Sequence, residues 1–155
     1  MTFWDISNGV HSMLITRKVE FSASHVCRNP ALTDARNQEI YGAAANPNGH
    51  GHNYVVEVTL RGDPDPVTGM VLDLKVLKAI LNEEVVEPFD HRFLNHEVPP
   101  FDRVIPTTEN IAIEIWRRIA PRLTSGGSGL EAVRVYETAD LFVDYFGEHE
   151  AGVRA

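Results

Sequence analysis

The stretch HGHNYVVEVTLR, residues 50–61, carries the alternation that decides the fold. From Tyr54 onward every second residue is apolar, as is typical of a strand that buries one face: Tyr54, Val56, Val58 and Leu60. His50 and His52 fall on the same alternation at the start of the segment. We therefore expect both imidazoles on the buried side, where this strand begins.

The earlier segment MLITRKVEFSASH, residues 13–25, alternates in the same way. One parity is apolar apart from Arg17: Met13, Ile15, Val19, Phe21 and Ala23. His25 continues this parity, so it is predicted to lie on the same buried face. Two adjacent strands would then bring three histidines to one side of a sheet.

Beyond these strands the apolar spacing becomes helical. Asp73 is predicted to cap a helix that Pro88 limits, and Thr107 or Thr108 to cap a second one, Ile111 to Leu123. A short helix over 34–41 lies between the first two strands, and Met70 to Leu72 begin or end a neighbouring strand. Two more strands follow, around 133–137 and 141–145. The order β-β-α-α-β-β predicts an α+β fold, with a four-stranded antiparallel sheet and two helices on one face.

Length and composition limit the class of protein. The 155 residues suit one domain, and 43% hydrophobic residues suit a globular one. A net charge of −8 argues against a nucleic-acid binder and against attachment to an anionic membrane. One cysteine excludes an internal disulfide framework, and no apolar run spans a bilayer. Residues 1–10 lack a basic segment followed by an apolar block, so we expect no secretory signal and a cytoplasmic protein.

The three histidines predict a metal site. Residues i and i+2 of a strand point the same way, so His50 and His52 can converge on one ion, with His25 from the neighbouring strand as the third ligand. Three imidazoles and one open position describe a catalytic zinc site, whereas a closed structural site needs a fourth ligand. The alternative for each histidine alone is a core residue with satisfied hydrogen bonds.

Two further features suggest acid–base and binding chemistry. Asp90 precedes His91, and a carboxylate beside an imidazole suits a proton shuttle, although a surface turn explains the dipeptide equally well. Glu137 follows two apolar strand positions, so its carboxylate needs a donor partner. A heterocycle with two parallel N–H groups would serve, and an internal salt bridge is the alternative.

The segments FSASH, NPNGHGHNY, TGMVLDL, DHRFLN, TTENIAIEIW and VYET occur in this order. Together they resemble the 6-pyruvoyl-tetrahydropterin synthase family over roughly residues 13–148. The chain also resembles the related 6-carboxytetrahydropterin synthase of queuosine biosynthesis. The resemblance implies a tunnelling fold (T-fold) in one domain spanning 1–155, and a homohexamer, a dimer of trimers, with active sites between subunits.

The family reaction converts 7,8-dihydroneopterin triphosphate to 6-pyruvoyl-tetrahydropterin, with loss of triphosphate and internal proton shifts. By matching motif, His25, His50 and His52 are expected to hold Zn2+, and Asp90 with His91 to relay protons. Glu137 is expected to anchor the pterin, and Thr107 and Thr108 to line its pocket. Basic groups for the triphosphate are expected nearby, with Lys18 and Arg28 as candidates.

One position departs from the family pattern. The family places a catalytic cysteine shortly before NPNGHGH, where this chain has Ala44. Three explanations remain open: an engineered replacement of a native cysteine, substitution by Cys27, or a branch with lost or changed activity. The alternatives to a pyruvoyl-forming lyase are therefore a carboxytetrahydropterin synthase and a pterin-binding protein without turnover.

Overall fold

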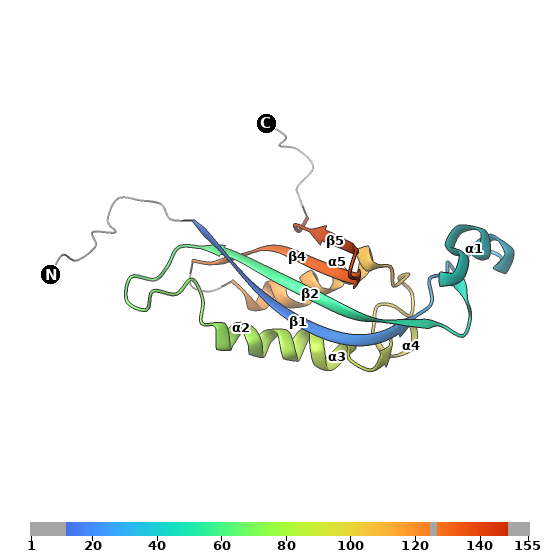
Figure 1. Cartoon of the computed structure of the whole chain (residues 1–155), viewed down its shortest axis with the longest axis horizontal. Coiled ribbons are helices and arrows are strands. Elements are labelled where there is room, and N and C mark those ends of the chain that lie inside the picture. Colours follow the sequence, from blue (N-terminus) through green and yellow to red (C-terminus); the bar gives the residue numbers. More distant parts are fainter. Residues whose placement is uncertain (1–11, 125–126, 149–155) are drawn as a thin grey trace, which may run out of the picture.

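The computed structural model describes residues 12–124 and 127–148 (Figure 1). The outer parts of the expected 1–155 domain, including the segment inspected for a secretory signal, lie outside these residues. The sheet of the described part has the strand order β3-β1-β2-β4-β5. Its four longer strands pair antiparallel as predicted: β1 (Met13–His25), β2 (His50–Gly62), β4 (Gly129–Thr138) and β5 (Leu141–Tyr145).

The fifth strand, β3 (Arg92–Phe93), was not predicted. It pairs parallel with Ala23 and Ser24 of β1, at the outer edge of the sheet. A two-residue strand is too short to show a periodicity in sequence, because an alternating pattern needs about four residues or more to be recognised.

The predicted helices are present. α1 (Asp34–Tyr41) starts at the Thr33 cap and continues into the 3-10 turn η1 (Gly42–Ala45). α2 (Leu74–Leu81) starts at Asp73 and runs through a π-turn, η2 (Asn82–Val86), into α3 (Glu87–Phe89), which ends one residue after Pro88. α4 (Leu94–Glu97) is one short turn, and α5 (Thr108–Ile119) continues into η3 (Ala120–Arg122). No helix in the described ranges is long and apolar enough to cross a membrane.

The expected strand at 70–72 is absent from the structure. The segment instead closes a loop, because the backbone N–H of Asp65 donates to the carbonyl of Met70 over 3.0 Å. The Val71 side chain is buried beside Gly62, at the end of β2. Its apolar character therefore reflects packing against the sheet and not strand pairing.

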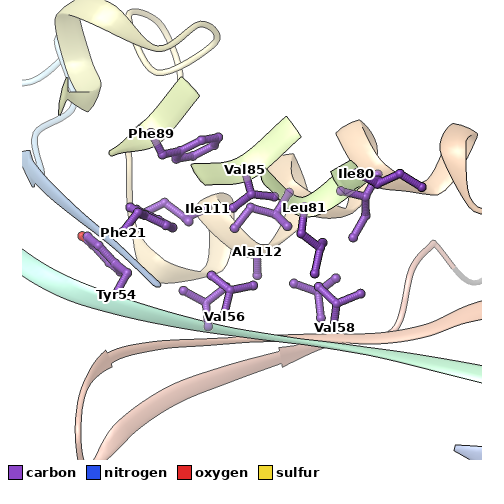
Figure 2. Packing of buried hydrophobic residues seen from close by; sticks show 14 of the residues in the cluster. Phe21, Tyr54, Val56, Val58, Ile80, Leu81, Val85, Phe89, Ile111 and Ala112 are labelled. Carbon is purple, nitrogen blue, oxygen red and sulfur yellow. The ribbon is translucent and has the colours of Figure 1, made fainter. Parts of the chain in front are cut away.

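The core lies between one face of the sheet and the helices. Figure 2 shows Val56 and Val58 of β2 facing Leu81 of α2 and Ala112 of α5, and all four side chains are fully buried. The opposite parity of β2, such as Glu57, is only partly covered. The helices therefore cover one face, as predicted, and the histidine parity of β1 and β2 is the covered one.

Candidate metal centre

Three histidines converge where β1 ends and β2 begins. His25 and His50 are direct partners across the two strands, and His52 lies opposite Ala23. Nε2 of His25 is 3.0 Å from Nε2 of His50, and one ring nitrogen from each of the three residues lies within 4.8 Å of the others. The parity argument is confirmed, because the three rings face the same small volume.

The protonation of His25 follows from its partner. Its Nδ1 lies 2.7 Å from the carbonyl oxygen of Pro106, which can only accept a hydrogen bond. Burial lowers the pKa of His25, so the ring is neutral near pH 7 and its single proton is on Nδ1. Nε2 therefore presents a lone pair to the other two rings, as a metal ligand must.

The donor set fits a divalent metal ion. Nδ1 of His50 and Nε2 of His52 are buried in the structure without a hydrogen-bond partner. Buried polar atoms without partners are costly, and a bound cation would satisfy Nε2 of His52. Burial also lowers the pKa of His52, which keeps that imidazole neutral and able to coordinate. Neutral imidazole is a ligand that Zn2+ accepts.

Gly51, between two of the histidines, allows the strands to approach closely. A Cβ atom at Gly51 would lie 3.1 Å from the carbonyl oxygen of Ala23 on β1. This distance is shorter than an ordinary carbon–oxygen contact, so a side chain at Gly51 would have to displace the backbone of β1.

Glu137 lies beside the histidines, at the end of β4. Its Oε1 is 3.4 Å from Nε2 of His52, and its Oε2 accepts a hydrogen bond from the hydroxyl of Thr108. Thr108 is buried at the first residue of α5, whereas the Thr107 hydroxyl caps that helix by accepting from the backbone N–H of Asn110. Of the two threonines, Thr108 therefore contacts the carboxylate while Thr107 shapes the helix start.

Asp90 and His91 do not join this cluster. They lie at the outer edge of β1, where the Ser22 N–H donates to Asp90 Oδ1 (2.8 Å) and the His91 N–H donates to the Ser22 carbonyl (2.6 Å). Ser22 is three residues before His25, roughly 10 Å along the strand. The dipeptide does form a side-chain pair, with His91 Nδ1 2.7 Å from Asp90 Oδ2.

A cleft of about 550 Å³ borders this pair. His91 and His52 both line this cleft, and so do Ser24 and Asn53. His91 has a positive φ of 57°, unusual for a residue with a side chain, and most of its side chain is exposed. The Ser22 hydrogen bond, followed by that from His91, holds the pKa of Asp90 below its usual value.

Cys27 and Ala44 are neighbours, because the Cys27 N–H donates to the Ala44 carbonyl over 2.8 Å. The Cys27 side chain is buried, with Sγ 4.0 Å from the Pro106 oxygen, and burial raises the pKa of its thiol to about 11. A thiol with such a pKa stays protonated near pH 7 and is a weak base and nucleophile. Cys27 is also not one of the convergent metal ligands.

The two candidate phosphate-binding residues already have acidic partners. Lys18 pairs with Glu57 over 2.7 Å and lies seven residues before His25, which is roughly 23 Å along β1. Arg28 is closer to the histidines in sequence and pairs with Asp34 over 2.7 Å.

Sequence reasoning missed three residues that contact the metal-site strand. They are Pro106, whose carbonyl orients His25; Tyr54, whose hydroxyl lies 3.4 Å from Nδ1 of His25; and Asn95, which bonds to the backbone of Val26. Asn95 belongs to the DHRFLN segment, one of the segments on which the family resemblance rests. No pattern in the sequence shows that the Asn95 side chain bonds to the backbone of Val26.

Comparison with protein families matches residues 14–148 to the model of 6-pyruvoyl tetrahydropterin synthase. The chain belongs to this family. It is 45% identical over 134 residues to human 6-pyruvoyl tetrahydrobiopterin synthase, covering 86% of this chain and 91% of the human protein. The corresponding protein of Poecilia reticulata is 47% identical over 134 residues, covering 86% and 90%.

The second similarity expected from sequence, to a 6-carboxytetrahydropterin synthase, is also found. A putative 6-carboxy-5,6,7,8-tetrahydropterin synthase of Archaeoglobus fulgidus is 40% identical over 95 residues, covering 61% of this chain and 73% of that protein. Among solved structures, Caenorhabditis elegans 6-pyruvoyl tetrahydropterin synthase matches with a TM-score of 0.84 at 37% identity, covering 88% of this chain and 96% of its own. This match confirms the predicted fold of the 6-pyruvoyl tetrahydropterin synthases.

Proposed function

We propose that this chain, as one domain with its core at 13–148, is a zinc-dependent lyase. Its substrate is 7,8-dihydroneopterin triphosphate, from which it eliminates triphosphate with internal proton shifts to give 6-pyruvoyl-tetrahydropterin. The observation that carries the proposal is the convergence of His25, His50 and His52 beside the Glu137 carboxylate. The names of the human and Poecilia reticulata relatives support the pterin substrate.

His25, His50 and His52 would hold Zn2+. When bound, zinc would supply Lewis acidity toward the side-chain hydroxyls of the pterin. His25 and His52 contribute by remaining neutral, since burial lowers the pKa of both. Pro106 and Tyr54 contact the His25 ring and restrict its orientation. The imidazole is therefore already in place before a metal ion or substrate binds.

Glu137 would anchor the amino-pyrimidine edge of the pterin. That edge offers two parallel N–H donors, which match the two oxygens of a carboxylate. The Thr108 hydroxyl occupies one lone pair of Oε2 and thereby fixes the plane of the carboxylate. Lone pairs remain on both oxygens, because an ionised carboxylate has about four acceptor positions.

Asp90 and His91 would relay protons to and from the substrate at an active site between subunits. Nδ1 of His91 is engaged by Asp90, which leaves Nε2 to accept and return a proton in the cleft. In one chain this pair does not join the histidine cluster. A homohexamer with active sites between subunits would let the pair of one subunit act beside the histidine cluster of another. Free sheet edges support such assembly. Within residues 12–124 and 127–148, residues 13–21 of β1 have no strand partner on their outer side, and β5 pairs only with β4.

The direct test is incubation of the zinc-loaded protein with 7,8-dihydroneopterin triphosphate. Release of triphosphate with a product of the pyruvoyl-tetrahydropterin mass supports the proposal. Acetaldehyde in place of that product identifies a carboxytetrahydropterin synthase, the reaction suggested by the Archaeoglobus fulgidus relative. A tight pterin complex without release, in both the natural chain and Ala44→Cys, identifies a binding protein and overturns the lyase assignment.

A further inference from the structure

We propose that Asn95 is a positioning residue for the metal centre. Its carboxamide holds the backbone of Val26 and thereby fixes the end of β1 from which His25 projects. The inference rests on the proposed metal site, and it assigns a role to a side chain whose hydrogen bonds, within the described residues, go to the backbone of Val26.

The Asn95 carboxamide makes a two-point contact with one residue. Its Oδ1 accepts from the Val26 N–H over 2.8 Å, and its Nδ2 donates to the Val26 carbonyl over 3.0 Å. A neighbouring strand would offer the same pair of groups. Val26 is 5% exposed, so without Asn95 both of its backbone groups would be buried and left without these partners.

Asn95 completes a row of contacts along the outer edge of β1. Asp90 and His91 bond to Ser22, and β3 pairs with Ala23 and Ser24. Asn95 then bonds to Val26, beyond the last residue of β3. His25 therefore lies between two fixed positions, and its Cα cannot move far without breaking one of them.

The same segment also contacts the strand that bears the other ligands. A Cβ atom placed on Gly49 would lie 3.2 Å from the ring of Phe93, so that ring packs directly against the residue before His50. Residues 93–95 thus support the backbone beside His25 and beside His50. Since the two ring nitrogens must stay within a few ångströms to share an ion, a shift at either backbone would weaken metal binding.

Asn37 provides a matched control within the same chain. Its Oδ1 accepts from the Asn29 N–H over 2.7 Å and its Nδ2 donates to the Asn29 carbonyl over 3.0 Å, the same two-point contact. Asn37 is on α1 and is 2% exposed. Its loss should therefore destabilise the fold as a lost buried contact does, without moving the end of β1.

The experiment compares Asn95→Leu, Asn95→Asp and Asn37→Leu with the natural chain. Zinc affinity is measured by competition with a chromophoric chelator, ligand geometry by the visible absorption of the Co2+ form, and metal-free stability by thermal unfolding. We expect both Asn95 variants to lose affinity by about 10–100-fold, as changes to groups that orient metal ligands do, with altered Co2+ bands. Asn37→Leu should lower the unfolding temperature and leave affinity and bands unchanged.

Equal zinc affinity and identical Co2+ bands in the natural chain and the Asn95 variants would overturn the inference while leaving the metal site intact. An equal loss of affinity in Asn37→Leu would also overturn it, because the effect would then be one of general stability. If Asn95→Leu does not fold, the near-isosteric Asn95→Asp decides, since it keeps the acceptor and loses the donor. Failure of the natural chain itself to bind zinc would overturn both this inference and the proposed function.

Discussion

The Nε2 atoms of His25 and His50 lie 3.0 Å apart, across the last residue pair that joins β1 to β2. Both nitrogens face His52, and the Pro106 carbonyl on the far side of the His25 ring keeps the Nδ1 proton away from them. At this distance the two nitrogens share a hydrogen bond when one of them carries a proton. A metal ion bound by both would take the place of that proton, which leads to the first prediction.

Replacing His50 by alanine should abolish stoichiometric zinc binding. Loss of a direct ligand should cost more than the roughly 10–100-fold in affinity that loss of an orienting group costs. Zinc content after dialysis, measured by atomic emission, checks this. The exposed His96 is the control, since His96→Ala removes an imidazole outside the cluster and should retain the metal. Full zinc content in His50→Ala would show that the metal binds elsewhere.

Replacing Glu137 by glutamine should weaken pterin binding and leave the zinc content unchanged. Hydrogen bonds to a charged group contribute about 1.5–3 kcal/mol, so we expect a loss of roughly 10–100-fold in pterin affinity. Titration of a non-reacting pterin, followed by fluorescence, measures the affinity. A parallel fall in both zinc content and pterin affinity would mean that Glu137 supports the metal site and does not anchor the pterin.

Asp90→Asn should destabilise the protein at neutral pH by an amount that shrinks in acid. The folded-state pKa of Asp90 is lowered by the Ser22 N–H and then by His91, so the ionised carboxylate is favoured in the folded state. This stabilisation is present above the ordinary aspartate pKa near 3.9 and is lost as pH falls through the lower folded value. Urea unfolding of both proteins between pH 7 and pH 3 measures the difference.

In this comparison the gap in unfolding free energy should be constant from pH 7 to about 5 and close below the ordinary aspartate pKa. A gap that instead widens in acid would show that the folded state raises the pKa of Asp90, contrary to its observed hydrogen bonds.

Ala44→Cys should increase the rate of triphosphate release if the natural chain lacks a proton-abstracting group at this position. General base catalysis contributes roughly 10²–10⁴-fold, and the buried Cys27, with its thiol pKa raised to about 11, is poorly suited to the role. Single-turnover kinetics at saturating substrate measure the step. Ala43→Cys, one position away in η1, is the matched control and should not accelerate release. If Cys27→Ala accelerated triphosphate release as much as Ala44→Cys does, the gain would not depend on a thiol at position 44, and the role given to that position would be wrong.

The fold and the convergence of the three histidines were predictable because both depend on period-two alternation. In residues 13–25 and 50–61 one parity carries the core side chains and the three histidines, and a strand has no other way to arrange them. The position of Asp90 and His91 was not predictable, because it depends on how the segment after α3 turns back onto β1. β3 has two residues and leaves no pattern in sequence. The N-terminal cap of α5 was narrowed to Thr107 or Thr108, and only the backbone angles decide between them.

The lack of a side chain at Gly51 has a consequence for how the centre can vary. The backbones of β1 and β2 approach closely at this point, which keeps His25 near His50 and His52, the histidines on either side of Gly51. An alanine here adds only a methyl group and no charge, yet the backbone of β1 at Ala23 would have to give way by a few tenths of an ångström, two residues before His25. Gly51 therefore sets how closely β1 and β2 approach, and with it the distance between His25 and the other two histidines of the candidate metal site.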